Sequence, residues 1–390
     1  MKRLSSITQS LEGQKMFQIM ERANQLEKTG KRVFHFEIGD PDFSSPEIAK
    51  TAAISAISQN MTKYAPSSGI INYKEACQEI TLKSRGFRPA LNQLLVTPGA
   101  NIQIYLACAC IIDPGDEVIV QDPCFVSYES IIKSLRGKAI RVPLSENNNF
   151  EIEPSELLKR ISPRTKAVII NSPHNPTGSV LSEATIKQIY SICEKYDIFV
   201  LSDEVYGRMI YEDSPNKFFS PSQIDHCNER TVIIHSLSKT YSMTGWRIGA
   251  VTGPSKLISK MAVLFETINS CVPPFIQHAA AELLKNEPNA SRLMMREYQK
   301  RRNIFMNRIT LLDGMLCNRP FGAFYGFVNI KSSGKDSISY ANHLLEEFGI
   351  ATCPGIYFGP SGEGYVRFCF ANSIANINSA FDRLDISKSF

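Results

Sequence analysis

Residues 231–251 read TVIIHSLSKTYSMTGWRIGAV, and the rest of the chain is organised around this stretch. An apolar run ends at His235, Lys239 follows among small residues, and Arg247 comes eight positions later. A lysine in this setting can be a nucleophilic amine that forms a Schiff base with a carbonyl cofactor such as pyridoxal phosphate, and a nearby hydroxyl and guanidinium suit that cofactor's phosphate. The alternative is a polar loop with an ordinary surface lysine, because short motifs give false positives. We favour the cofactor site.

The size and composition of the chain are those of an ordinary globular protein. Its 390 residues give room for two domains, and hydrophobic residues make up 43% and charged residues 21%. The balance of 43 Lys and Arg against 38 Asp and Glu gives a net charge of +5, without a basic tract. We therefore expect no nucleic acid as a partner.

Cysteine usage and hydropathy predict a cytoplasmic protein. The ten cysteines show neither paired metal-type spacing nor the density of a disulfide scaffold, so we expect reduced thiols and no metal site. The first ten residues lack the apolar core of a secretory signal, and no stretch approaches the length of a membrane span. No membrane partner is expected.

Short apolar runs alternate with helical patterns through the middle of the chain. Strands are expected at residues 117–120, 138–142, 167–170, 198–201, 231–235 and 248–251. Helical patterns such as residues 182–196 lie between most of them, which indicates parallel strands joined by crossovers and an α/β large domain. Ligands of such sheets gather beyond the carboxyl ends of the strands.

The two ends of the chain predict a smaller α+β domain. A helix at residues 14–28 and a strand at 33–38 come first, and strands near 322–330 and 364–370 alternate with helices at the carboxyl end. The predicted parts are an amino-terminal segment that packs with the small domain, a large cofactor-binding domain and a small domain, with bounds 1–45, 46–285 and 286–390.

Candidate polar groups follow the predicted strands. Gly39 and Gly99 lie in turns, and the Gly99 turn opens a helix whose free N–H groups attract an anion such as phosphate. Asp203 follows the fourth strand and can keep a pyridine nitrogen protonated, while Tyr206 and Asn175 can donate to a phenolate oxygen. Taken one at a time, a plain turn, a buried carboxylate or a paired arginine is the commoner explanation.

The order and spacing of these motifs resemble the fold-type I pyridoxal-phosphate-dependent aminotransferases of classes I and II, typified by aspartate aminotransferase. The resemblance covers residues 14–384. The matching motifs are GDPDF from Gly39, YxPxxG from Tyr64, VTxG ending at Gly99, NPTG from Asn175, DEVY from Asp203, SxSK ending at Lys239, GxRxG ending at Gly249, GAFY from Gly322 and YVR ending at Arg367. So many ordered motifs are highly specific.

This resemblance implies a large domain with a mixed, mostly parallel sheet and a smaller α+β domain, and a homodimer with shared active sites. It implies that an amino group moves from an L-amino acid to a 2-oxo acid. Lys239 would form the internal aldimine and move the proton from the substrate's α-carbon. Asp203 would pair with the pyridine nitrogen, and Tyr206 and Asn175 with the phenolate oxygen.

The resemblance also implies the remaining contacts. Phe125 would stack on the cofactor ring, and Tyr64 would reach in from a second subunit. The phosphate would meet Gly99, Ala100, Asn101, Ser236, Ser238 and Arg247. Arg367 would clamp the substrate α-carboxylate, helped by Asn175 and the backbone of Gly39.

The chain departs from the family pattern at three of these positions. Ala100 and Asn101 stand where relatives often have a hydroxyl residue or lysine, which leaves open how far side chains bind phosphate there. Phe125 replaces the more usual tyrosine or tryptophan but still offers an aromatic face.

Two alternative functions remain open from sequence. One is a lyase or cyclopropane-forming synthase on the same fold, and the other is a non-catalytic cofactor-sensing regulator. The donor amino acid is also open: its side chain is expected near Met16, Phe17, the Tyr64 loop and the partner subunit. No second cation for an acidic side chain is identifiable.

Overall fold

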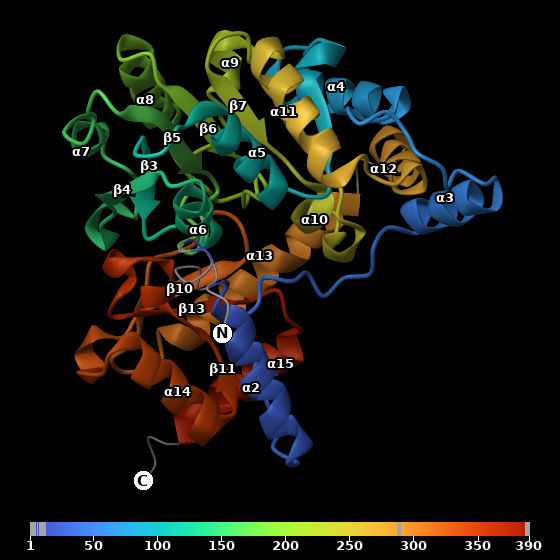
Figure 1. Ribbon diagram of the computed structural model, residues 1–390. Coiled ribbons are helices and arrows are strands. Elements are labelled where there is room, and N and C mark those ends of the chain that lie inside the picture. The colour runs from blue at the N-terminus through green and yellow to red at the C-terminus, as the bar shows by residue number, and fades with distance from the viewer. Residues whose placement is uncertain (1–4, 6, 8–12, 287–289, 387–390) are drawn as a thin grey trace.

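The computed structural model describes residues 5, 7, 13–286 and 290–386. A seven-stranded sheet forms its centre (Figure 1). The strand order is β2 (Leu94–Thr97), β8 (Gly249–Thr252), β7 (Thr231–Ile234), β6 (Phe199–Asp203), β5 (Thr165–Asn171), β3 (Glu117–Asp122) and β4 (Lys138–Pro143).

The sheet is mixed and mostly parallel, as predicted. Only β8 runs antiparallel to its neighbours, β2 and β7. Central strands such as β3 and β7 are buried at every position, whereas the edge strand β4 is partly exposed. Strands covered on both faces bury mostly apolar side chains, which explains the continuous apolar runs of the sequence. Glu117, Gln121 and Asp122 are the buried polar residues of β3.

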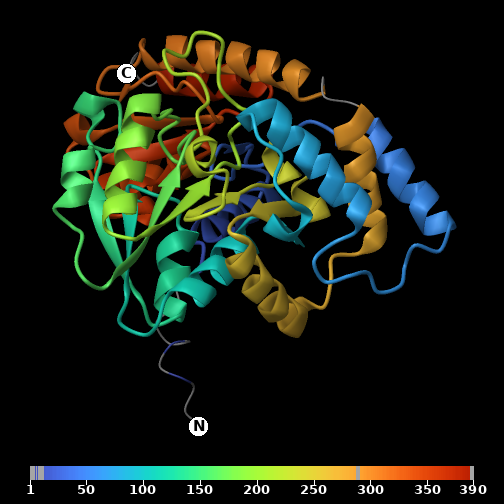
Figure 2. The ribbon, with the colours of Figure 1, turned by 90° about the horizontal axis from the view of Figure 1, so that it is seen from above.

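Helices flank this sheet (Figures 1 and 2). They are α4 (Ile71–Arg85), α5 (Asn101–Ile111), α6 (Ser127–Ser134), α7 (Pro154–Leu158), α8 (Glu183–Lys195), α9 (Ser222–Asp225), α10 (Leu237–Thr240), α11 (Ser255–Asn269) and α12 (Pro274–Asn286). A further helix, α3 (Glu47–Ser58), packs on α12 and projects from the edge of the molecule. Local chemistry sets their ends: the Ser182 side chain accepts from the Thr185 N–H at the start of α8, and Gly86, in the left-handed conformation, ends α4.

A smaller unit packs below the sheet in the view of Figure 1. Its four-stranded antiparallel sheet has the order β12 (Cys353–Pro354), β13 (Tyr365–Cys369), β10 (Tyr325–Asn329) and β9 (Leu316–Cys317). The strand β1 (Phe34–His35) pairs in parallel with β11 (Ile350–Ala351). Its helices are α2 (Met16–Lys28), α13 (Ala290–Ile309), α14 (Ser337–Phe348) and α15 (Ile374–Ile386).

One local prediction was wrong, and one strand of the central sheet was not predicted. The strand expected at residues 33–38 is only two residues long, because the chain beyond Phe36 turns toward the cavity described below and the Glu37 carbonyl accepts from Arg367 instead of a sheet neighbour. The sequence reading also omitted β2, which pairs with β8 and brings the Gly99 turn to the centre of the molecule. The three proposed domain bounds stay a prediction.

All ten cysteines carry free thiols. Across the described ranges, the chain has no helix that combines the length and the apolar composition needed to cross a bilayer.

Candidate active site

A cavity of about 290 Å³ lies at the carboxyl ends of β5, β6 and β7, where the small unit faces the central sheet. Every residue predicted from the sequence except Gly99 and Tyr64 lines it. These are Gly39, Ala100, Asn101, Phe125, Asn175, Asp203, Tyr206, Ser236, Ser238, Lys239, Arg247 and Arg367. The tertiary structure thus brings together groups that are more than 300 residues apart in the chain.

Asp203 ends β6 and is buried in the cavity wall. Its Oδ2 accepts a hydrogen bond of 2.6 Å from the Tyr128 hydroxyl, and its Oδ1 accepts one of 3.2 Å from the Val205 N–H. Burial raises the pKa of this carboxyl to about 6, although the Tyr128 bond opposes the rise. A cation beside Asp203 would therefore stabilise its ionised form.

Tyr128 was missed in the sequence. It lies in the first turn of α6, three residues after Phe125, and its ring meets the Phe125 ring edge-on at 5.6 Å between centroids. A tyrosine on an otherwise apolar helix face looks like a core residue, so only its spacing from Phe125 could have pointed to it.

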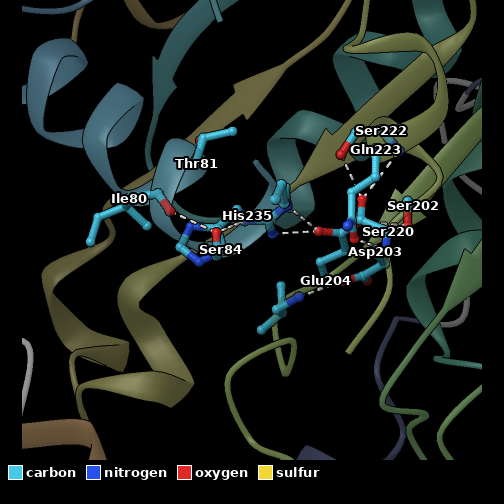
Figure 3. A network of polar contacts seen from close by, with 12 residues as sticks. Ile80, Thr81, Ser84, Ser202, Asp203, Glu204, Ser220, Ser222, Gln223 and His235 are labelled. Carbon is cyan, nitrogen blue, oxygen red and sulfur yellow. Dashed lines mark hydrogen bonds and ion pairs between the residues drawn. The ribbon is translucent and has the colours of Figure 1, made fainter. Parts of the chain in front are cut away.

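A buried polar network lies behind Asp203 (Figure 3). Its centre is Glu204, whose carboxylate accepts from Arg85 Nε at 2.9 Å, from Ser202 Oγ at 2.9 Å and from the Ser220 hydroxyl. Both members of the Arg85–Glu204 ion pair are almost fully buried. Sequence patterns gave no sign of this pair, because its members are 119 residues apart.

Lys239 lies on the short helix α10, directly after β7. The Ser236 hydroxyl accepts from the Ser238 N–H at 3.1 Å and so holds the start of this turn. The Lys239 ammonium donates to the Gly39 carbonyl, and burial lowers the pKa of this amine from 10.5 to about 8. A larger share of this lysine is therefore neutral near pH 7 than of an exposed one.

Arg247 packs against the Gly99 turn. Its Nη1 donates to the Thr244 carbonyl at 2.9 Å and its Nη2 to the Pro98 carbonyl at 3.2 Å. Gly99 has φ +83°, and a Cβ there would lie 2.5 Å from Arg247 Nη2. Glycine is thus needed both for the turn and for the approach of the guanidinium. The turn places a cation beside the start of α5, where Ala100 and Asn101 line the cavity.

Arg367 comes from β13 of the small unit and is 1% exposed. Its Nη1 donates to Asn175 Oδ1 at 2.9 Å and its Nη2 to the Glu37 carbonyl at 2.6 Å, while its buried Nε has no partner among the described residues. The Asn175 N–H in turn donates to Asn171 Oδ1 at 2.8 Å. A buried guanidinium with an unused donor suits an anionic ligand.

Tyr325 is a second residue that the sequence reading did not single out as part of the site. Its hydroxyl lies 2.7 Å from that of Tyr206, and a Cβ added to Gly39 would collide with it. Gly39 is therefore required here by close packing against Tyr325, and a plain turn is not a sufficient explanation of it.

Tyr64 is not brought into the cavity by its own chain. Its side chain is 89% exposed. The predicted role of Tyr64 depends on a second subunit, and it stays a prediction.

The groups of the cavity fit the pyridoxal phosphate expected from the sequence. Asp203 is a buried carboxylate with no cationic partner among the residues that the structure describes. Lys239 is an amine with a lowered pKa, and Arg247 is a cation beside a helix start. Asp203 can therefore pair with a protonated ring nitrogen, the Lys239 amine can add to an aldehyde, and Arg247 with the helix start can bind a phosphate.

Comparisons with known proteins agree with this chemistry. A family model described as aminotransferase class I and II matches residues 31–384. An aspartate aminotransferase of Pyrococcus horikoshii is 39% identical over 95% of this chain and 93% of that protein. An aromatic-amino-acid aminotransferase 2 of Thermococcus litoralis is 37% identical over 89% of this chain and 90% of that protein. The solved structure of aspartate aminotransferase from Thermus thermophilus with maleate superimposes with a TM-score of 0.93 at 32% identity, and covers 98% of this chain and 99% of that chain.

Proposed function

The chain belongs to the class I and II aminotransferases, and on this premise we propose which of its residues carry out the reaction. It is a pyridoxal-phosphate-dependent enzyme that transfers an amino group between an amino acid and a 2-oxo acid. One observation carries the assignment of roles: Lys239, Asp203 and Arg367 line the same cavity although they come from separate elements.

The bound cofactor supplies an aldehyde carbon to which amines add and a ring that withdraws electrons from the substrate's α-carbon. Lys239 holds the cofactor in the resting enzyme and accepts the α-proton during turnover, because its lowered pKa keeps part of it neutral near pH 7. It would then deliver that proton to the aldehyde carbon of the cofactor. Asp203 would be the anionic partner of the protonated ring nitrogen.

Hydrogen-bond donors and an aromatic ring orient the cofactor. Tyr206 and the Nδ2 of Asn175 donate to its ring oxygen, since Asn175 Oδ1 is already occupied by Arg367. Phe125 stacks on the ring. The phosphate is bound by the Gly99 turn with Ala100 and Asn101, and by Ser236, Ser238 and Arg247.

Arg367 orients the substrate. Its guanidinium binds the α-carboxylate, helped by Asn175 and the backbone at Gly39, and this fixes the α-carbon within reach of Lys239. The contacts with Asn175 and the Glu37 carbonyl restrain the Arg367 side chain before substrate arrives, so little freedom is lost on binding.

The enzyme acts as a homodimer whose partner subunit contributes Tyr64. In support, Tyr64 is 89% exposed, and Ile54 on the neighbouring helix α3 is 66% exposed. Both views show α3 at the outer edge of the molecule beside α12 (Figures 1 and 2). Exposed apolar side chains on a projecting helix are typical of an interface. We also place the enzyme in the cytoplasm.

Replacement of Lys239 tests the proposed mechanism. Lys239→Ala removes the group that moves the α-proton, so turnover should fall to background and the absorbance of the resting cofactor should change. The matched control is Lys260→Ala, which removes an exposed lysine of α11. Normal turnover by Lys239→Ala would contradict the assignment. An assay for ammonia in the absence of a 2-oxo acid distinguishes amino-group transfer, which releases none, from elimination, which releases it.

A further inference from the structure

A carboxylate of the central sheet binds a loop of the small unit. The loop comprises residues 355–362 and contains the short helices η5 (Gly355–Phe358) and η6 (Pro360–Gly362). Asp122, the last residue of β3, is 3% exposed, and its Oδ2 accepts from the Ser361 hydroxyl at 3.0 Å. The Ser361 N–H lies 3.3 Å from each of the two carboxylate oxygens. Neither residue is among those that line the active-site cavity.

The loop approaches Asp122 so closely that only glycine fits at position 359. Gly359 has φ +128°, and a Cβ added there would collide with Asp122 Oδ1 and Arg141 Nη1. Arg141 Nη1 donates to Asp122 Oδ1 at 3.4 Å. Burial raises the pKa of Asp122, while the Arg141 cation and the bonds from Ser361 oppose this rise. The buried carboxylate thus depends on its contact with the loop for hydrogen-bond donors.

The same loop packs against Arg367. The Arg367 guanidinium lies over the ring of Phe358, at 4.8 Å from the centroid, and over the ring of Tyr325, at 4.4 Å. Phe358 is 1% exposed, and its carbonyl accepts from the N–H of Cys124, two residues after Asp122, at 2.8 Å. The hydrogen bonds of the guanidinium hold two of its nitrogens, and the rings restrain its plane. Two-pronged binding of a carboxylate depends on that plane.

We propose that Asp122 and Ser361 are positioning residues for the substrate: their contact holds Phe358 against Arg367 and so sets the plane in which Arg367 binds the α-carboxylate. This inference rests on the role proposed for Arg367 and adds the residues that orient it. Both residues act through Arg367 and are not catalytic. Loss of their contact therefore weakens the binding of a ligand that carries a carboxylate and spares a ligand that lacks one.

Two small ligands of nearly equal shape isolate this effect. 2-Methylalanine carries an amine and an α-carboxylate, and tert-butylamine has a methyl group in place of the carboxylate. Neither has an α-hydrogen, so titration of the holoenzyme, followed by the absorbance of the bound cofactor and by calorimetry, measures binding without turnover. The natural enzyme should bind 2-methylalanine about tenfold more tightly or better, as hydrogen bonds to a charged group supply.

Replacement of Ser361 tests the contact. Ser361→Ala removes the hydroxyl bond to Asp122, so the affinity for 2-methylalanine should fall about three- to tenfold, the effect of one hydrogen bond, while that for tert-butylamine stays unchanged. Ser361→Thr keeps the hydroxyl and should restore the affinity. The matched control is Ser332→Ala, whose lost bond to the Gly314 carbonyl lies within the small unit. An equal loss for both ligands, or no loss for either, would overturn the inference.

A second variant displaces the loop without removing a polar group. Gly359→Ala places a Cβ against Asp122 and Arg141, and should lower the affinity for 2-methylalanine at least as much as Ser361→Ala does. Gly334→Ala is the control, because Gly334 also has a positive φ, +68°, but a Cβ there would meet no atom of the described residues within 4 Å. Unchanged binding of 2-methylalanine by Gly359→Ala would overturn the inference.

The natural enzyme separates this inference from the proposed function. Equal affinities of the natural enzyme for the two ligands would contradict the role of Arg367 itself, and the inference with it. A preference for 2-methylalanine that remains the same in Ser361→Ala and Gly359→Ala would overturn the inference alone and leave the role of Arg367 intact.

Discussion

At the scale of single residues, the hydroxyl of Tyr128 affects the charge of the carboxylate on which the cofactor depends. Burial raises the pKa of Asp203 to about 6. The hydrogen bond from Tyr128 is the largest of the influences that keep this pKa from rising further. Tyr128 touches Asp203 and acts through it, so it is a positioning residue. The effect of removing the Tyr128 hydroxyl on cofactor binding should therefore depend on pH. A purely structural role would give the same effect at every pH.

Tyr128→Phe should weaken the binding of pyridoxal phosphate to the apoenzyme. Loss of a hydrogen bond to a charged group costs about 1.5–3 kcal/mol, which corresponds to about 10- to 150-fold in affinity. The loss should be larger at pH 6.5 than at pH 8.5, because a raised Asp203 pKa leaves more of the carboxyl neutral at the lower pH. Fluorescence titration measures both values. Tyr196→Phe, at an exposed position, is the control, and an equal loss at both pH values would contradict the role.

The lowered pKa of Lys239 predicts the pH dependence of cofactor attachment. Burial depresses this pKa to about 8, so the neutral amine accumulates as the pH rises toward 8 and is complete above it. The attachment rate of the apoenzyme should rise about tenfold from pH 6.5 to 7.5 and level off near pH 9. Stopped-flow absorbance measures this rate. A rate that keeps rising steeply to pH 10, as for an exposed lysine, would contradict the shift.

At the scale of elements, strand β6 serves two purposes at its carboxyl end. Successive side chains of a strand point to opposite faces. Asp203 therefore lines the cavity, while Glu204 enters the buried network with Arg85 and Ser220. The network anchors the end of the strand that carries Asp203 (Figure 3).

Arg85→Met should strongly destabilise the enzyme, since it leaves Glu204 buried without its cation. Breaking one side of a buried pair costs about 3–5 kcal/mol of unfolding free energy. The double variant Arg85→Met with Glu204→Gln removes both charges and should recover much of that loss. Chemical denaturation measures all three proteins. Equal stability of Arg85→Met and the natural enzyme would contradict the importance of the pair.

The sequence predicted the bounds of most helices and strands to within a few residues. The predictions that failed did so for identifiable physical reasons. Long amphipathic helices such as α8 and buried strands such as β7 have patterns that depend only on near neighbours. The strand β1 was overestimated because the alternation of residues 33–38 does not reveal where the chain leaves its partner β11. Tyr128 and Tyr325 were not assigned to the site because their partners are distant in the chain.

At the scale of the whole molecule, two units close around one cavity. The central sheet provides Asp203 and the turn that holds Lys239, while the small unit provides Arg367. The role proposed for the exposed Tyr64 requires that another copy of the chain completes the site. This arrangement can be tested by mixing two inactive variants.

Hybrids of Tyr64→Ala and Lys239→Ala should regain activity if the site is shared between subunits. In a mixed dimer, the subunit with an intact Lys239 receives an intact Tyr64 from its partner. Random pairing of equal amounts then leaves about a quarter of all sites native. Coexpression with two affinity tags isolates the hybrid, whose kcat is compared with each parent. A hybrid with only the average activity of its parents would contradict a shared site.

The sequence alone determined the family, the α/β class and most of the cavity residues, because these follow from short motifs in a set order and from local periodicity. The tertiary structure decided what those residues touch. Arg367 donates a hydrogen bond to Asn175, which lies 192 residues away in the chain, and Tyr128 donates one to Asp203, which lies 75 residues away. The opening lysine, Lys239, owes its lowered pKa to burial by segments far from it. Burial and long-range contacts depend on how elements pack, which no local pattern encodes.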